Sequence, residues 1–451
     1  MKTLDQIGAE LQGYDPQSLS ADDVLAFLDQ LVSPLSASTD TESLPRFEAL
    51  GRVLAADVVS PLDVPPHDNS AMDGYAFDGA ELRPGQPLYL RCVGTALAGK
   101  AWAGHVTAGQ CVKIMTGAIM PAGLNTVAPQ ELVASSGDNI TVPAGQLRLG
   151  DNRRHRGEDL VLGRCALLKG ELVTPARLGL AASLGLPTLC CFRPLRVAYF
   201  STGDEILSLG EAPREGAVYD SNRYTVFALL KRIGCEVIDL GVVRDDPALL
   251  EAAFRQAAAQ ADAIVTSGGV SVGEADYTKA MMKKLGDVAF WRIAMRPGRP
   301  MAVGRLNLHQ FEEKSASNRG VQKLDSYQPD SAQGQAILFG LPGNPVAVMV
   351  TFLAFVRPAL LRMMGASVTA PVLLKAQSAE AIRKKAGRTE YQRGWVHTAA
   401  DGLLSVRTTG NQGSGVLSSM AGANGLIVLH HAQGNVAIGD AVDVLMFEGV
   451  M

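Results

Sequence analysis

The sequence predicts a multidomain α/β chain in which one doubly wound domain is joined to β-rich domains. At 451 residues the chain is too long for a single hydrophobic core, so two to four domains are expected. Residues 195–364 alternate buried strands with amphipathic helices, the pattern of a mostly parallel sheet covered by helices on both faces. Residues 61–168 and the stretch after residue 371 consist of short apolar runs separated by glycines, which is typical of β structure.

The part of the chain before residue 195 divides into helical and β-rich sections. Helices are expected at 24–31 and 45–54, and another follows Thr174, which suits an N-cap before Pro175 at the first helical position. We therefore assign residues 1–60 together with 169–194 to one domain and residues 61–168 to a second, β-rich domain. The first twenty residues read as an extension.

The doubly wound region, residues 195–364, supplies its elements in a regular order. Strands are expected at 196–200, 235–243, 262–267, 288–294, 300–304 and 336–340, and helices at 224–234, 246–261, 276–286 and from residue 345. The polar segment 307–335 interrupts this rhythm and is expected to be a long inserted loop. Residues 365–451 fit a small barrel or a sandwich.

Composition excludes several classes of protein. The net charge of −4 provides no basic excess for binding nucleic acid. The longest apolar run, 346–356, is far shorter than the roughly 20 residues that span a bilayer, and the polar N-terminus lacks a signal-peptide core. The cysteines and histidines show no zinc-ligand or disulfide spacing. We expect a cytoplasmic protein without a membrane segment.

Polar or glycine-rich stretches follow five of the predicted strands. In a doubly wound sheet, ligands bind outside the carboxyl ends of the strands. We therefore expect one site formed by residues 201–205, 244–247, 268–277, 295–300 and 341–345.

These stretches contain groups suited to a bulky anion. Gly268 and Gly269 allow backbone N–H groups to approach it closely, and Arg292 and Arg296 add permanent positive charge. Asn344 and Pro345 suit the N-cap and first position of a helix whose N-terminus also favours an anion.

Carboxylates occur in the same stretches. Glu205, Asp245 and Asp276 would repel a phosphate unless a divalent cation lay between them, and Mg²⁺ is held by few carboxylates and by phosphate oxygens. The combination predicts a Mg²⁺-dependent site for a phosphorylated or pyrophosphate-containing ligand. Each residue alone also fits a helix cap, a turn or a solvated position, so the inference depends on their coincidence at one edge.

The stretch "PPHDNSAMDGYAFDG" at 65–79 has neither helical nor strand periodicity. Two readings are open from its residues. It is either a surface turn rich in turn-forming residues or a rigid loop that presents Asp68 and Ser70 to a ligand.

Eight motifs together resemble the molybdopterin molybdenumtransferases, the bacterial MoeA proteins that are similar to the E domain of gephyrin. In chain order they are "DNSAMDGYA", "IMTGA", "RGED", "STGDE", "GCEVIDLGVVRDDP", "SGGVSVGEADYTK", "LPGNPV" and "GNQGS". The match runs from about residue 25 to about residue 447. The resemblance implies an elongated subunit, a domain at 195–364 like molybdopterin adenylyltransferase, a C-terminal β-barrel and a homodimer in which the 68–76 loop faces the partner's crevice.

The resemblance also implies the reaction: adenylylated molybdopterin and molybdate give molybdenum cofactor and AMP, with Mg²⁺-dependent cleavage. The implied catalytic residues are Asp68, Asp159, Glu205, Asp245 and Asp276, the last three also as metal ligands. The implied substrate-binding residues are Ser70, Thr116, Gly268, Gly269, Ser271, Arg292, Arg296, Pro342, Asn344, Pro345, Arg393 and Ser414. Further expected partners are the molybdopterin adenylyltransferase and molybdoenzyme chaperones.

Two other functions stay open from the sequence. The chain could itself be a molybdopterin adenylyltransferase, although about 280 residues lie outside the domain that the two would share. It could also be a gephyrin-like scaffold, although its acidic residues are intact. Arg292 and Arg296 stand where the family often has lysine, and this change keeps the charge but alters donor geometry.

Overall fold

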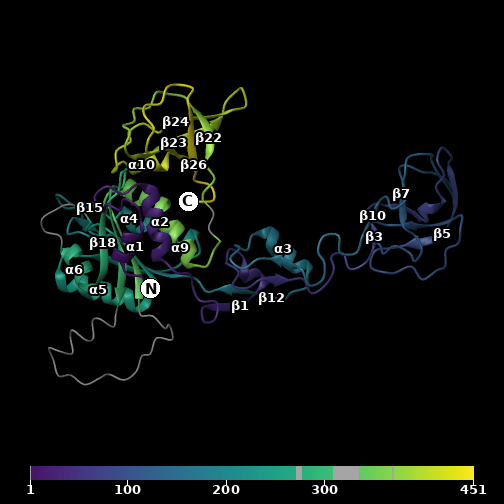
Figure 1. Cartoon of the computed structure of the whole chain (residues 1–451), viewed down its shortest axis with the longest axis horizontal. Coiled ribbons are helices and arrows are strands. Elements are labelled where there is room, and N and C mark those ends of the chain that lie inside the picture. Colours follow the sequence, from purple (N-terminus) through teal and green to yellow (C-terminus); the bar gives the residue numbers. More distant parts are fainter. Residues whose placement is uncertain (1, 271–276, 308–334, 368–369) are drawn as a thin grey trace, which may run out of the picture.

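The computed structural model describes residues 2–270, 277–307, 335–367 and 370–451. The subunit is elongated, as expected (Figure 1). An α/β lobe and the C-terminal domain lie together at one end and contain both ends of the chain, a narrow arm leaves the lobe, and a separate β domain lies at the far end of the arm. The segment 308–334, most of the expected insertion, lies outside the described residues. Asn307 and Gln335, which flank it, pair directly with each other in the sheet.

The lobe is built on a six-stranded sheet in the order β16–β13–β17–β21–β20–β18. In that order its strands are Glu236–Val243, Arg196–Thr202, Ala263–Ser267, Gln335–Leu341, Pro300–Asn307 and Gly286–Arg292. The first four run parallel, and β20 is antiparallel to both of its neighbours. The mostly parallel sheet predicted from the sequence is therefore confirmed.

Helices cover both faces of this sheet. One face carries α5 (Pro247–Gln260) and α6 (Tyr277–Leu285), and the other carries α4 (Ser221–Arg232) and a closing helix. The closing helix runs from α8 (Pro345–Thr351) through a π-helical turn (Phe352–Val356) to α9 (Arg357–Met363). Alternate residues of β13 enter the two cores, because successive side chains of a strand point to opposite faces.

The closing helix is longer than the apolar run in the sequence indicates. By length and composition, Pro345–Met363 could cross a membrane, but 72% of its apolar window is buried inside the chain. It is the central core helix of the lobe.

The N-terminal helices α1 (Leu4–Glu10) and α2 (Ala21–Leu31) pack on the lobe and not on the arm. The Trp291 ring contacts the Phe27 ring edge-on, with centroids 4.9 Å apart. The Arg305 guanidinium donates a hydrogen bond to the Leu31 carbonyl at 2.7 Å. This placement corrects the assignment of the whole segment 1–60 to the domain that contains 169–194. Burying the apolar face of an amphipathic helix requires a partner surface, and the sequence does not identify which one.

The arm consists of two short antiparallel pairs and one helix. Strand β1 (Thr41–Pro45) pairs with β12 (Thr188–Phe192), β2 (Val58–Val59) pairs with β11 (Cys165–Leu167), and α3 (Pro175–Ser183) packs beside them. Thr174 caps α3 as predicted. The predicted helix at 45–54 is wrong: only a 3₁₀ turn, η1 (Arg46–Ala49), forms there, because Gly51 has a left-handed φ of +76° and Val53 and Leu54 form bridges with Leu172 and Cys191.

The far domain is all β, with one 3₁₀ turn, η2 (Gly79–Glu81), among its described residues. Its six-stranded sheet has the order β7–β4–β6–β5–β9–β8, namely Thr126–Pro129, Gly74–Phe77, Gln110–Ile114, Leu88–Ala96, Asn139–Val142 and Ala134–Ser136. A separate two-stranded pair, β3 (Asn69–Ser70) with β10 (Arg153–Arg154), lies at the end nearer the arm (Figure 1).

The C-terminal domain is a closed five-stranded β-barrel. Its strands follow the order β23–β24–β22–β26–β25, and β25 returns to pair with β23. In that order they are Thr389–Thr398, Leu404–Thr408, Leu374–Ser378, Ala441–Met446 and Gly425–Leu429, with α10 (Leu417–Ala421) beside them. The barrel alternative is confirmed. Strand β19 (Met295–Arg296), which belongs to the lobe, pairs with β23 and joins the two domains. Two further short strands of the lobe, β14 (Ile206–Leu207) and β15 (Val218–Tyr219), pair with each other.

A charged cluster fixes the arm to the lobe. The Arg193 guanidinium donates to both Asp262 oxygens at 2.7 and 2.9 Å and to Asp40 at 2.9 Å, while Arg196 donates to Asp262 at 3.1 Å. Burial opposes ionisation of Asp262, but the hydrogen bonds from the two arginines outweigh it and hold its pKa below the ordinary range. Two-point arginine–carboxylate bonds fix direction as well as distance.

We predict that Asp262→Asn destabilises the lobe by roughly 1–3 kcal/mol at pH 7, because two arginines lose a charged acceptor. The lowered pKa makes this contribution complete above a pH of about 4 and lost as the pH falls through the folded-state pKa. Urea unfolding should be measured from pH 7 downward. The difference in free energy of unfolding between wild type and variant should decrease below about pH 4. The control is Asp29→Asn, which removes the exposed ion pair with Arg362. Equal losses in the two variants would contradict the prediction.

Candidate functional site

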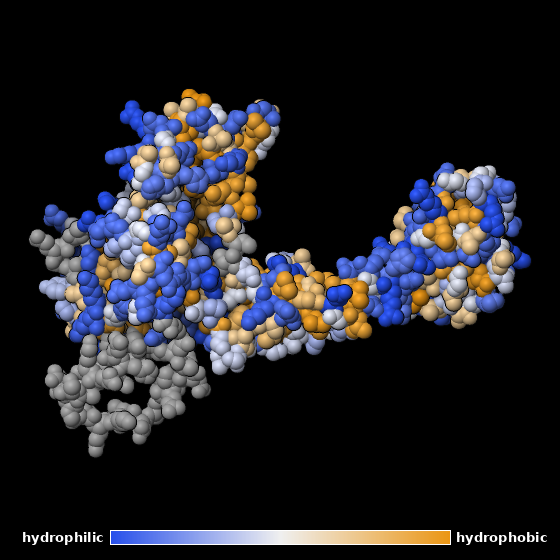
Figure 2. Space-filling model, viewed as in Figure 1, coloured by the Kyte–Doolittle hydropathy of each residue, from blue (hydrophilic) through white to orange (hydrophobic). Residues whose placement is uncertain are grey.

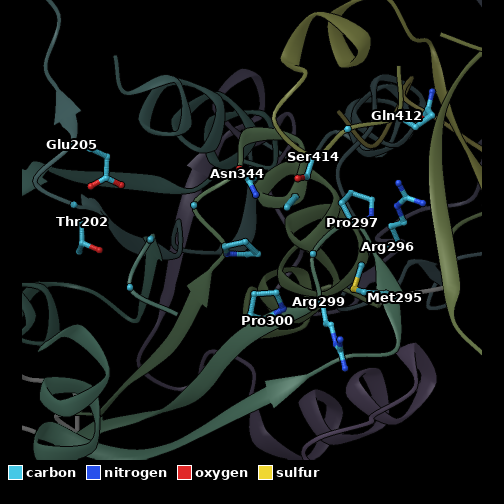
Figure 3. Close-up of a pocket in the computed structure, with 18 of the residues that line it drawn as sticks. Thr202, Glu205, Met295, Arg296, Pro297, Arg299, Pro300, Asn344, Gln412 and Ser414 are labelled. Carbon is cyan, nitrogen blue, oxygen red and sulfur yellow. The ribbon is translucent and has the colours of Figure 1, made fainter. Parts of the chain in front are cut away.

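A pocket of about 670 Å³ lies at the carboxyl edge of the lobe sheet, beneath the barrel (Figure 3). Described residues from all five predicted stretches line it, and the barrel closes it with Arg388 and residues 412–414. In the view of Figure 3, Glu205 and Thr202 lie at one end, Arg296 and Gln412 at the other, and Asn344 and Ser414 between them. The predicted convergence of these stretches at one edge is present in the structure.

Two glycines shape the pocket wall where β17 ends. Gly268 and Gly269 have φ angles of +93° and +65°. A Cβ on Gly268 would lie 2.4 Å from the Thr202 carbonyl oxygen, and a Cβ on Gly269 would lie 2.5 Å from Cβ of Thr278. No side chain fits here, so the backbone itself faces the pocket.

Acidic groups occupy the end of the pocket near β13 and β16. Glu205 and Asp245 both line it. The Asp245 backbone N–H donates to Asp204 at 3.3 Å, which ties the two loops together. Ser271 and Asp276 lie outside the described residues. Within the described ranges, no three His, Cys, Asp or Glu side chains gather as a metal site.

Thr202 is a pocket residue that the sequence reasoning did not select. Its side chain is buried, and its hydroxyl has no hydrogen-bond partner among the described residues. It belongs to the quoted "STGDE" stretch, so the position after the strand was a signal that could have identified it. The hydroxyl is available to a ligand in the pocket.

The opposite wall is cationic. Arg296 ends the short strand β19, Arg299 follows it just before β20, and Arg388 comes from the barrel. Arg299 lies in a stretch that the sequence singled out, whereas Arg388 stands in a segment with no distinguishing pattern. Arg292 is not among the residues that line the pocket; its backbone N–H donates to the Pro16 carbonyl, and its carbonyl accepts from the Leu19 N–H.

Arg393 does not line the pocket either. It is 1% exposed and donates to the Ser419 hydroxyl at 3.0 Å and to the carbonyls of Asn411 and Gly413 at 3.1 and 2.9 Å. Burial, with a smaller effect of nearby Arg296, lowers its pKa to about 10. Arg393 therefore holds the loop that carries Ser414 and does not itself reach the cavity.

Some of the predicted residues at the start of α8 line the pocket and others do not. Pro342 and Asn344 line the pocket, while Pro345 is the first residue of the helix. Asn344 occupies the N-cap position but its side chain makes no capping hydrogen bond, so the amide is available to the pocket. The Val346 N–H donates to the Ser414 carbonyl at 3.0 Å. One backbone N–H in the first turn of α8, which we expected to be open to an anion, is therefore already bonded.

The remaining predicted residues lie in the far β domain, remote from this pocket in the same chain (Figure 1). Asp68 accepts a hydrogen bond from the Arg156 backbone at 2.8 Å, and its carboxylate is partly exposed. Asp159 is exposed in the adjoining loop. Within residues 65–79, Gly74–Phe77 form strand β4 and Ser70 is fully buried, so Ser70 is not presented to a ligand, whereas Asp68 precedes β3 and keeps a partly exposed carboxylate.

Ser70 and Thr116 use their hydroxyl groups within this loop system. Ser70 is fully buried and donates to the Met72 carbonyl at 2.5 Å. Thr116 donates from both its N–H and its hydroxyl to Asp73 at 2.7 Å, and these bonds lower the pKa of Asp73. Both residues shape the loop that presents Asp68.

We predict that Gly269→Ala destabilises the protein by at least about 1 kcal/mol, because alanine in the left-handed region is strained and its Cβ would overlap Thr278. Thermal unfolding should show this loss. The matched control is Gly343→Ala, also in the pocket wall, where a Cβ would come no closer than 4.0 Å to its nearest neighbour, Gly268. A melting temperature for Gly269→Ala as high as that of the control would show that the wall is not constrained.

Comparison with known proteins gives one consistent result along the chain. Family models match residues 19–185 (MoeA N-terminal region, domains I and II), 198–362 (probable molybdopterin binding domain) and 375–447 (MoeA C-terminal region, domain IV). A protein of Haemophilus influenzae named molybdopterin molybdenumtransferase is 38% identical over 94% of this chain and 98% of its own length. A protein of the same name from Nostoc is 34% identical, covering 97% and 95%.

A solved structure agrees with these matches. The molybdopterin biosynthesis moeA protein from Pyrococcus horikoshii OT3 has a TM-score of 0.75 and 26% identity, covering 95% of this chain and 100% of that one. Three consecutive family models, relatives above 30% identity over nearly their whole length and the shared architecture lead to one conclusion. The chain belongs to the MoeA family.

Proposed function

We propose that this protein is a molybdopterin molybdenumtransferase, which converts adenylylated molybdopterin and molybdate into molybdenum cofactor and AMP. The observation that carries the proposal is the mixed charge of one pocket: Glu205 lies at one end and Arg296 at the other (Figure 3), and Asp245, Arg299 and Arg388 are also among the lining residues. Such a pocket can hold a nucleotide-linked pyrophosphate and a separate oxyanion at the same time.

The residues of the cationic end suit molybdate. Molybdate is a tetrahedral dianion and requires fixed cationic donors and hydroxyl groups. Arg296 lines this end, and the Ser414 hydroxyl and the Asn344 amide are available between the two ends. The backbone at Gly268 and Gly269 can approach phosphate oxygens closely.

The acidic end fits Mg²⁺. Two carboxylates are consistent with this ion, which keeps several waters and is completed by substrate phosphate oxygens. We infer that Glu205 and Asp245 would hold it together with Asp276. When bound, the ion neutralises charge on the pyrophosphate that is cleaved. The carboxylates themselves would otherwise repel that group.

The direct test is incubation of the protein with adenylylated molybdopterin, Mg²⁺ and molybdate, with AMP and molybdenum cofactor as the measured products. Consumption of ATP with unadenylylated molybdopterin would favour the adenylyltransferase alternative. Absence of product, with no rescue of a strain that lacks the transferase, would favour a scaffold. A chelator such as EDTA should stop AMP release, and added Mg²⁺ should restore it.

We further propose that the active unit is a homodimer with composite sites. Asp68 and Asp159 are remote from the pocket of their own subunit, so they can contribute to chemistry only at a pocket of another copy. The arm exposes apolar side chains, with Phe47 89% and Leu50 51% exposed, and Figure 2 shows hydrophobic residues gathered along it. Apolar surface of this kind is typical of a subunit interface.

Mixed dimers test the composite site. Asp68→Ala and Glu205→Gln chains should each be inactive alone, because every site would lack one group. A mixed dimer should recover part of the activity, since one of its two sites then contains both intact residues. Transferase activity in purified, differently tagged mixed dimers is the measurement. No recovery in verified mixed dimers would contradict the proposal.

We also propose that the protein works in the cytoplasm and receives its substrate from a molybdopterin adenylyltransferase. Its substrate is the adenylylated product of that enzyme, and its product is the ligand that molybdoenzyme chaperones accept. Contacts with both classes of protein follow from this position in the reaction sequence.

A further inference from the structure

Three hydroxyl groups meet inside the lobe, directly behind the start of the pocket wall. The Tyr199 hydroxyl lies 2.7 Å from Ser267 Oγ and 2.9 Å from Ser201 Oγ, while Ser267 donates to Ser201 at 3.2 Å. All three residues are at most 2% exposed. A hydrogen bond between two hydroxyl groups is usually shorter than about 3.0 Å. The two serines are therefore joined mainly through Tyr199.

The strand register explains why these side chains meet. Tyr199 and Ser201 are two residues apart on β13, so they point to the same face of the sheet. Ser201 and Ser267 are opposite each other in the parallel pairing of β13 with β17. The Tyr199 ring belongs to the core on the face that α4 covers. A hydroxyl buried in such a core requires hydrogen-bond partners, and the two serines supply them.

The next residue on each strand belongs to the pocket. Thr202 follows Ser201, and both Thr202 and Glu205 line the cavity (Figure 3). Gly268 follows Ser267 and lines it too. A Cβ on Gly268 would lie only 2.4 Å from the Thr202 carbonyl oxygen, so the two strand ends are in close contact. A change in the spacing of the two serines would therefore move the glycine wall relative to the loop that carries Glu205.

The Tyr199 phenol is a neutral group that a ligand does not reach. Burial raises its pKa well above the ordinary range, and the hydrogen bonds to the two serines oppose this effect only in part. Tyr199 is fully buried and is not among the residues that line the pocket. Any effect of this hydroxyl on a ligand must pass through Ser201 and Ser267.

We propose that Tyr199 is a positioning residue whose hydroxyl sets the spacing between the acidic loop after β13 and the glycine loop after β17. The inference rests on the proposed function for naming the ligand as adenylylated molybdopterin. Its pyrophosphate would need the backbone at Gly268 and a cation near Glu205 at one fixed separation. A displacement of about 1 Å in such a site can cost up to about 100-fold in rate.

The first variant is Tyr199→Phe, which keeps the ring and removes only the hydroxyl. Hydrogen–deuterium exchange of the backbone amides at 203–205 and 268–270 should become faster, because only the 3.2 Å contact then joins the two serines. In the transferase assay, kcat/KM for adenylylated molybdopterin should fall about 3- to 10-fold, while KM for molybdate stays within about two-fold. Because the phenol is neutral, the fold-loss should be the same from about pH 6 to about pH 9.

Two further variants separate positioning from stability. Tyr14→Phe removes a phenol hydroxyl of the same lobe that accepts a hydrogen bond from Trp291 Nε1 at 3.0 Å and lies outside the pocket lining. It should leave exchange at both loops and kcat/KM unchanged. Adding Ser201→Ala and Ser267→Ala to Tyr199→Phe removes the hydroxyls left without a partner, which should restore part of the melting temperature. The strand ends stay unlinked, so exchange and kcat/KM should not recover.

Three results would overturn the proposal. The first is exchange at wild-type rates in both loops of Tyr199→Phe. The second is an equal loss of kcat/KM in Tyr14→Phe, which would indicate general destabilisation. The third is full recovery of kcat/KM in the triple variant, which would show that the hydroxyls only satisfy one another. If wild type itself releases no AMP, the proposed function fails, and the exchange rates of Tyr199→Phe and Tyr14→Phe still decide whether Tyr199 holds the wall.

Discussion

The pocket depends on the backbone pairing between β19 and β23. Residues 295–296 leave the lobe sheet after β18 and add to the edge of the barrel, with Met295 opposite Thr389 and Arg296 opposite Glu390. A second link, from the Val346 N–H to the Ser414 carbonyl, ties the first turn of α8 to the barrel loop. Backbone hydrogen bonds of this kind fix register, so the barrel residues face the sheet edge at one position only.

The charges of the pocket follow from this attachment. The carboxyl ends of the parallel strands supply glycine and acidic loops, while the barrel and the 295–300 loop supply guanidinium groups. The acidic loops and the guanidinium groups thereby line one cavity from different elements, and each set can contact a different part of a ligand. Donors that are already fixed need not reorganise when charge develops, which is the usual source of electrostatic catalysis.

A different constraint governs the far β domain. The chain leaves the lobe after α2, returns to it after β12, and at that return Arg193 and Asp262 hold the arm by a two-point ion pair that also includes Asp40. The arm therefore leaves the lobe in a defined direction and carries Asp68 away from the pocket of its own subunit (Figure 1). Geometry within one chain thus separates acidic residues that the family motifs associate with one reaction.

The sequence by itself determined the doubly wound sheet, the β character of the flanking domains and the edge at which the site forms. These features follow from local periodicity and from the rule that parallel strands end at one edge, both of which are encoded over short segments. Gly268, Glu205, Asp245 and Asn344 could be selected for this reason. The sequence also favoured a helix at 45–54, where the left-handed Gly51 and the bridges of Val53 and Leu54 to distant segments limit helical structure to one turn.

Only the tertiary structure decided which arginines reach the cavity and where the N-terminal helices pack. Arg393 and Arg388 are five positions apart on neighbouring parts of the barrel, yet one is buried behind the loop at 411–413 and the other lines the pocket. Arg292 has a suitable charge but its backbone is tied to residues 16 and 19. These outcomes depend on contacts between segments far apart in the sequence, and local patterns of charge and hydrophobicity carry no information about such contacts.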